Sequence, residues 1–143
     1  MSGDGAAISP GRWNRSGTRV VYASASLSLA LLERLVHAER RILGARLASY
    51  RLTIPPSVRV EDLRFDDLPG HWRAVPAPAE TRTLGSRWAE ARRCAVLRVP
   101  SAVVPVEFNY VLNPLHADFK RITVAGPEGF EFDPRLGSQR GTD

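Results

Sequence analysis

The sequence is poor in cysteine, in lysine and in long apolar runs, and each shortage excludes a class of protein. Cys94 is the only cysteine among the 143 residues, so an internal disulfide is excluded and nothing indicates an oxidising compartment. The longest apolar stretch, residues 27–32, is interrupted by Ser28 and is far shorter than the roughly 20 residues of a membrane-spanning helix. The opening MSGDG has neither the basic nor the apolar region of a signal peptide. We therefore expect a cytoplasmic protein that does not enter a membrane.

Metal sites and several common catalytic motifs are also missing. The histidines His37, His71 and His116 lie far apart, without the spacing of metal ligands, and we expect no metal. Cys94 lies in an apolar run and is interpreted as a small buried side chain rather than a nucleophile. No G-x-x-x-x-G-K-[ST], H-E-x-x-H or G-x-S-x-G motif occurs, which excludes the nucleotide-binding loop and the hydrolase classes that these motifs define.

Arginine supplies nearly all of the positive charge. The net charge is +5, and Lys120 is the only lysine. The arginines are scattered and are not interleaved with aromatic residues, as a nucleic-acid platform would require, so we do not expect nucleic-acid binding. The excess charge is suited to a phosphate-bearing ligand or to an acidic partner.

The length and the hydrophobic pattern predict one α/β or α+β domain, with an ordered core over residues 3–136 and a flexible tail over 137–143. A first helix is expected from Ser24 or Ser26 to Leu43, with an apolar face broad enough to indicate deep burial and with Glu33 on the opposite side. A second helix is expected over 80–92, with Gly85 as its weak point.

The remaining segments predict strands and loops. Strands are expected at residues 18–23, 50–54, 94–99, 121–124 and 130–132, and loops at 1–17 and 55–79. Residues 104–112 contain Pro105 and predict an edge strand or an irregular segment.

Polar residues in otherwise apolar segments are the candidates for chemistry. Arg12 offers a planar fork of donors for a phosphate or carboxylate, and Tyr22 ends a strand where it could stack on a flat ring. Glu33 lies on the first helix, and Ser101 follows a strand. Each has a plainer interpretation: a surface arginine, a core tyrosine, a solvated glutamate and a turn-capping serine. Taken singly, none of the four exceeds that interpretation.

Their order along the chain is more specific than any one of them. The segments GRWN, VVYASASLSLALLE, LPGHW, LGSRW, VPSAVVPVEFN and FEFDPRL together resemble the RES-domain toxins of bacterial toxin–antitoxin pairs, from about residue 3 to residue 136. By this resemblance Arg12, Tyr22, Glu33 and Ser101 match the family's arginine, tyrosine, glutamate and serine. Asn14 and Asn109 lie in segments that the family shares.

The resemblance implies a fold similar to ADP-ribosyltransferase toxins, a central mixed sheet flanked by helices, and NAD+ as the substrate rather than a bound cofactor. Glu33 would stabilise positive charge on the ribose or hold its hydroxyl, and Arg12 would hold the pyrophosphate. Tyr22 would stack on the nicotinamide, and Ser101 would orient the ligand or the glutamate. Asn14 and Asn109 would also contact the substrate.

The resemblance also implies a cognate antitoxin as partner, and it leaves open whether the chain forms homo-oligomers or only assembles with the antitoxin. The ADP-ribosyl acceptor stays open between water, phosphate and a protein. A non-catalytic interaction module is a further alternative. Family members carry a strand before the GDGA segment, which here follows Met1 and Ser2 directly, so we expect that strand to be missing.

Overall fold

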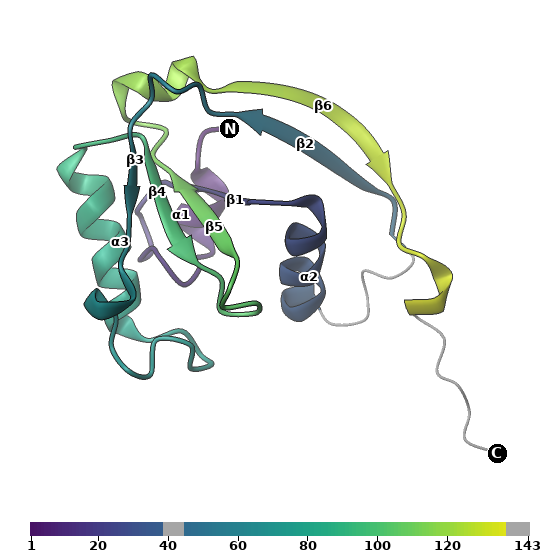
Figure 1. Ribbon diagram of the computed structural model, residues 1–143, viewed down its shortest axis with the longest axis horizontal. Coiled ribbons are helices and arrows are strands. Elements are labelled where there is room, and N and C mark those ends of the chain that lie inside the picture. The colour runs from purple at the N-terminus through teal and green to yellow at the C-terminus, as the bar shows by residue number, and fades with distance from the viewer. Residues whose placement is uncertain (39–44, 137–143) are drawn as a thin grey trace.

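A four-stranded sheet forms the centre of the molecule (Figure 1). Its strands lie in the order β1 (Val21–Ser24), β5 (Phe108–Leu112), β4 (Val96–Pro100) and β3 (Val60–Asp62). β3 and β4 run parallel, whereas the other neighbouring pairs run antiparallel. The computed structural model, which describes residues 1–38 and 45–136, therefore confirms the predicted α+β domain with a mixed sheet and flanking helices.

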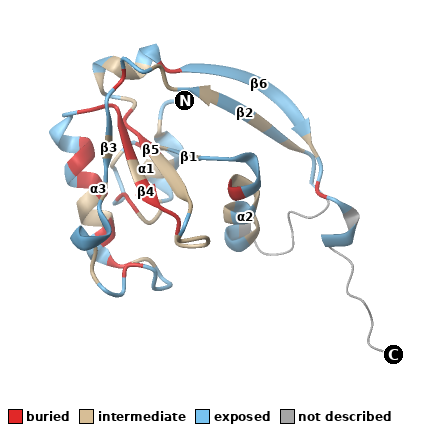
Figure 2. Ribbon diagram, viewed as in Figure 1, coloured by how far each residue is buried: buried red, intermediate tan, exposed pale blue. Residues whose placement is uncertain are grey.

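The core lies on both faces of the two middle strands, where buried residues concentrate (Figure 2). β4 is buried along almost its whole length because it is covered on each face. One face packs the aromatic side chains Trp13, Trp72 and Trp88 against Leu97 and Val111. The other face packs a smaller set of buried residues: Val58, Ala95, Val96, Leu112 and Ile122.

Helix α3 (Ala79–Ala91) confirms the second predicted helix and covers the aromatic face of the sheet. Gly85, expected to be its weak point, is instead the point of closest contact. A Cβ atom at this position would lie 1.9 Å from the carbonyl oxygen of Trp13. Only glycine allows this approach of helix and backbone, so α3 lies directly against the segment that contains Arg12.

The prediction of a loop over residues 1–17 is wrong in part, because a short helix α1 (Asp4–Ile8) forms there. Its carbonyl groups are bound by the segment that follows. The Asn14 side chain donates to the Ala6 carbonyl at 2.7 Å, and the Gly17 N–H donates to the Ala7 carbonyl at 2.9 Å. These tertiary hydrogen bonds stabilise a helix too short to be favoured by its own sequence.

Helix α2 (Leu27–Ala38) is present, but its expected deep burial is wrong. Leu27, Leu32 and Val36 are 47%, 42% and 59% exposed, whereas Leu29 is fully buried. The side of α2 that carries Leu29 and Glu33 turns towards the sheet. The prediction that Glu33 lies on a solvated face is therefore wrong. The expected continuation through residues 39–43 lies outside the described residues, as does the predicted tail over 137–143.

Strands β2 (Leu47–Thr53) and β6 (Thr123–Phe130) form a separate, curved antiparallel ribbon (Figure 1). The two short strands expected over 121–124 and 130–132 are thus one strand. β6 tolerates Gly126 and Pro127 because it pairs on one side only, opposite a register shift between Ser49 and Arg51.

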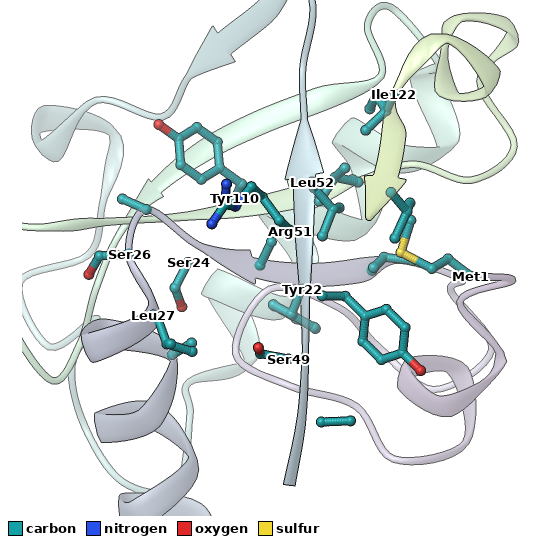
Figure 3. Close-up of a pocket in the computed structure, with 18 of the residues that line it drawn as sticks. Met1, Tyr22, Ser24, Ser26, Leu27, Ser49, Arg51, Leu52, Tyr110 and Ile122 are labelled. Atoms are coloured by element: carbon teal, nitrogen blue, oxygen red, sulfur yellow. The ribbon is translucent and has the colours of Figure 1, made fainter. Parts of the chain in front are cut away.

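Between this ribbon, β1 and α2 lies a hollow of about 1460 Å³ (Figure 3). Its lining is mostly apolar and includes side chains from α2, β2 and β6: Leu27, Leu31, Leu47, Leu52, Val124 and Phe130.

The segments around the sheet differ from expectation in two further places. Residues 104–107, which include Pro105, are irregular, as one of the two alternatives predicted. The edge strand is wrong, because residues 108–112 form β5, which lies between β1 and β4. The predicted loop over 55–79 contains β3 and a 3-10 helix, η2 (Phe65–Asp67). Two more 3-10 helices are η3 (Ala117–Arg121) and η4 (Pro134–Leu136). None of the helices in the described part of the chain is long and apolar enough to cross a membrane.

Candidate active site

Glu33 is held at one carboxylate oxygen by two strong hydrogen bonds. The Ser101 hydroxyl donates to Glu33 Oε1 at 2.8 Å, and Asn109 Nδ2 donates to the same atom at 2.6 Å. The second oxygen, Oε2, has His37 Nε2 at 3.9 Å, which is beyond hydrogen-bond distance. Among the residues that the structure describes, Glu33 therefore has one oxygen fixed by hydrogen bonds and one with only His37 nearby, on a side chain that is 21% exposed.

The two donors to Glu33 are themselves fixed. Ser101 is fully buried at the end of β4, where its hydroxyl oxygen accepts the N–H groups of Val103 and Val104 at 3.1 and 3.0 Å. These bonds direct its proton to Glu33. Asn109 is paired across the sheet with Ser24, whose hydroxyl donates to Asn109 Oδ1 at 2.7 Å. That bond orients the amide so that its NH2 group faces the carboxylate.

Tyr22 lies two residues before Ser24 on β1, so both side chains project from the same face of the strand. Its hydroxyl donates to Asn14 Oδ1 at 2.8 Å and accepts the Trp13 N–H at 3.0 Å. Burial of the hydroxyl raises the pKa of Tyr22, although 39% of the residue is exposed. Tyr22 is also one of the residues that line the hollow beside the β2–β6 ribbon (Figure 3), so it combines a tethered, neutral phenol with a partly exposed aromatic side chain.

Asn14 and Gly11 support Tyr22. Asn14 is fully buried, and its Oδ1 accepts from both Tyr22 and the Gly11 N–H. Its amide hydrogens are shared among the carbonyls of Ala6, Arg15 and Thr18. A Cβ at Gly11 would lie 2.8 Å from the Tyr22 hydroxyl oxygen. The structure thus places Asn14, a predicted ligand-binding residue, beneath Tyr22 with its hydrogen-bonding groups used by the protein.

Arg12 is partly buried and is held by a turn of the chain. Its guanidinium donates to the carbonyl oxygens of Trp72 and Ala74. Burial lowers the pKa of Arg12, the charge of Glu33 opposes that shift, and the charges of Arg73 and Arg82 add to it. Arg12 and Glu33 are therefore within electrostatic range of each other, and the guanidinium stays protonated at physiological pH.

The structure thus brings the predicted residues to one region. Ser101, Asn109 and Glu33 are joined directly, Arg12 interacts electrostatically with Glu33 and Tyr22, and Asn14 lies behind Tyr22. Across residues 1–38 and 45–136, no three histidine, cysteine or acidic side chains gather in a way that would hold a metal ion.

Three residues of this region were missed from the sequence. Ser24 or Ser26 was expected to begin the first helix; Ser26 caps α2 by accepting the Leu29 N–H at 3.1 Å, and Ser24 instead donates to Asn109. Strand alternation could have placed Ser24 beside Tyr22. Arg73 and Arg82 carry no local signal, because their position depends on how the turn and α3 pack.

Fold and site together define a small α+β domain with a mixed sheet. At one side of the sheet it carries a carboxylate fixed by hydrogen bonds, an arginine and a partly exposed tyrosine. The chain belongs to the RES domain family, whose model matches residues 1–133.

The matches to curated relatives cover most of this chain and most of each relative. It is 39% identical over 136 residues to a "Toxin Res" of Yersinia enterocolitica, which spans 94% of this chain and 89% of the relative. It is 38% identical to a "Prs ADP-ribosylating toxin" of a Sphingobium strain, over 95% of this chain and 86% of that one. It is 41% identical to a "Toxin Res" of Photorhabdus laumondii, over 94% of this chain and 86% of that relative.

Proposed function

We propose that the protein is a toxin that cleaves NAD+ at the bond between nicotinamide and ribose. The observation that carries this proposal is the Glu33 carboxylate, fixed through Oε1 by two hydrogen bonds, with only His37 near Oε2 in the described part of the chain. Breaking the glycosidic bond sends its electron pair to the nicotinamide ring and leaves positive charge on the ribose. A preorganised carboxylate stabilises that charge as it develops.

The other side chains would bind and orient the dinucleotide. Arg12, anchored to the turn at residues 72–74, would hold the diphosphate through its remaining N–H donors. The partly exposed side chain of Tyr22 would stack on nicotinamide while its hydroxyl stays tethered. Ser101 would act on Glu33 rather than on the substrate, because its proton is directed at Oε1.

Water is the simplest acceptor of the ADP-ribosyl group. Its oxygen would bond to the ribose carbon from which nicotinamide has left and would release a proton to solvent, giving ADP-ribose, nicotinamide and H+. Inorganic phosphate would attack the same carbon through an oxygen and give ADP-ribose phosphate. Transfer to a protein is the second candidate function, favoured by the name of the Sphingobium relative.

The test is to incubate the purified chain with NAD+ in three arms: phosphate-free buffer, phosphate buffer, and a bacterial lysate with labelled NAD+. We expect nicotinamide release in at least one arm: in all three if water is the acceptor, only with phosphate present if phosphate is, and only in the lysate if a protein is. The second product confirms the acceptor. Glu33→Gln should remove the activity, whereas Glu90→Gln, which changes an exposed glutamate of α3, should not. No nicotinamide above the blank from the wild-type chain in any of the three arms would refute the proposal.

As a toxin of this kind the protein would act on cytoplasmic NAD+ and would need an antitoxin. We expect that partner to present carboxylates to the arginines around the site, because guanidinium groups bind carboxylates in a planar, two-point geometry. Addition of the cognate antitoxin to the NAD+ assay should stop nicotinamide release. Undiminished cleavage in a stable mixture of the two proteins would contradict this expectation.

A further inference from the structure

Arg82 lies on the side of α3 that faces the Arg12 segment. Residues three and four apart share a face of a helix, so Arg82, Gly85 and Ser86 form one row. Gly85 lies against the Trp13 carbonyl, and the Ser86 hydroxyl accepts the Arg15 N–H at 2.9 Å. Since Gly85 meets Trp13 and Ser86 meets Arg15, the preceding turn of α3 brings Arg82 towards Arg12.

One donor of the Arg82 guanidinium lacks an acceptor within the described part of the chain. This donor is the Nε group, which is buried. A buried donor without an acceptor costs free energy, and the cost is larger for a charged group. The charge of Arg82 also acts on both Arg12 and Tyr22, which is consistent with a guanidinium beside the pair.

Arg73 brings a third guanidinium to the same place. Arg12 donates to the carbonyls on both sides of Arg73, those of Trp72 and Ala74. The Arg73 Nε donates at 3.1 Å to the carbonyl of Ala102, the residue after Ser101. Arg73 therefore spans from the turn that holds Arg12 to the loop that follows Ser101.

Three like charges around one point repel each other, and Glu33 is the acidic group that acts on Arg12. A second negative group would balance them, and a diphosphate matches both the charge and the donor geometry of guanidinium groups. We propose that Arg82 and Arg73 form, with Arg12, the binding site for the diphosphate of the dinucleotide. This inference rests on the proposed function, and it assigns to Arg82 and Arg73 the discrimination between substrates with and without phosphate.

The test measures binding, so it does not depend on turnover. Calorimetric titration with ADP-ribose should give a dissociation constant at least about tenfold higher for Arg82→Gln than for the wild-type chain. Binding of nicotinamide riboside, which has no phosphate, should change by less than about twofold. Arg82→Lys keeps the charge but loses the fork of donors, so its dissociation constant for ADP-ribose should lie between those of the wild-type chain and Arg82→Gln. Arg87→Gln removes an exposed arginine of the same helix and should leave both affinities unchanged.

Arg73→Gln is the second variant, because Arg73 is exposed and its replacement leaves the core intact. It should also weaken ADP-ribose more than nicotinamide riboside. Wild-type affinity for ADP-ribose in both glutamine variants would overturn the inference, as would a wild-type chain that binds neither ADP-ribose nor inorganic pyrophosphate. If ADP-ribose binding depends on Arg82 but NAD+ is not cleaved, the site stands and the proposed reaction fails. If NAD+ is cleaved but Arg82→Gln does not change ADP-ribose binding, the proposed reaction stands and the proposed diphosphate site fails.

Discussion

The hydrogen bonds that position Glu33 allow a quantitative prediction for Asn109 and Ser24. Asn109 Nδ2 donates to Glu33 Oε1 at 2.6 Å, and a hydrogen bond to a charged group is worth about 1.5–3 kcal/mol. If that free energy positions the carboxylate in the transition state, Asn109→Ala should lower kcat/KM for nicotinamide release about 10- to 150-fold. Ser24 acts through a neutral bond at 2.7 Å, worth about 0.5–1.5 kcal/mol, so Ser24→Ala should cost about 2- to 12-fold.

The double variant separates positioning from general damage. Because Ser24 acts on Glu33 only through Asn109, the Ser24→Ala, Asn109→Ala variant should be no slower than Asn109→Ala alone. Ser24→Thr keeps the hydroxyl and should retain near wild-type kcat/KM, and Ser28→Ala, an exposed position on α2, should have no effect. Nicotinamide release can be followed chromatographically, with a thermal melt of each variant. If the loss of kcat/KM in the double variant equals the product of the two single losses, Ser24 does not act through Asn109 and the prediction is refuted.

Three further predictions concern the scaffold. Gly85→Ala should lower the free energy of unfolding by about 1–3 kcal/mol or more in urea, since its Cβ would lie 1.9 Å from the Trp13 carbonyl; Gly5→Ala, which meets nothing within 4 Å, is the matched control. Burial raises the pKa of Tyr22, so the stability that its neutral phenol contributes is present below about pH 10 and is lost as the pH rises further. The free energy of unfolding in urea should therefore fall less between about pH 8 and pH 11 in Tyr22→Phe than in the wild-type chain. An equal fall in both proteins would contradict this prediction. Burial likewise raises the pKa of the Cys94 thiol, so iodoacetamide should label Cys94 only in unfolded protein, as mass spectrometry can show.

Elements with strong periodicity or dense apolar composition could be predicted from the sequence. Helix α3 lies within one residue of its expected bounds, and β4 (Val96–Pro100) overlaps most of the strand expected over 94–99. In each case the local pattern agrees with the tertiary environment. Where the two disagree the prediction was wrong. α2 was expected to be deeply buried, yet much of its apolar face borders the hollow beside the curved ribbon.

Elements that depend on partners far along the chain could not be predicted. α1 is stabilised by the carbonyl bonds of Asn14 and Gly17, which its own five residues do not announce. β3 has only three residues and exists through its parallel pairing with β4. Pro105 predicted an edge strand or an irregular segment over 104–112, but the proline precedes the strand and β5 lies inside the sheet.

The candidate site shows the same division. Residue types and their order named Arg12, Tyr22, Glu33 and Ser101, because each carries chemistry that is uncommon in an apolar segment. The sequence did not distinguish a ligand-facing residue from a supporting one: Asn14 lies beneath Tyr22, and Ser101 faces Glu33. That distinction depends on hydrogen-bond directions, which only the fold determines.

A crystal structure of the Glu33→Gln variant soaked with NAD+ would locate the dinucleotide. We expect the diphosphate at the Arg12 guanidinium, the nicotinamide ring on Tyr22 and its ribose beside position 33. Tyr22 also lines the hollow between β1 and the β2–β6 ribbon (Figure 3), whereas Arg12 does not. A dinucleotide bound in that hollow with its diphosphate away from Arg12 and its ribose away from position 33 would contradict the proposed site.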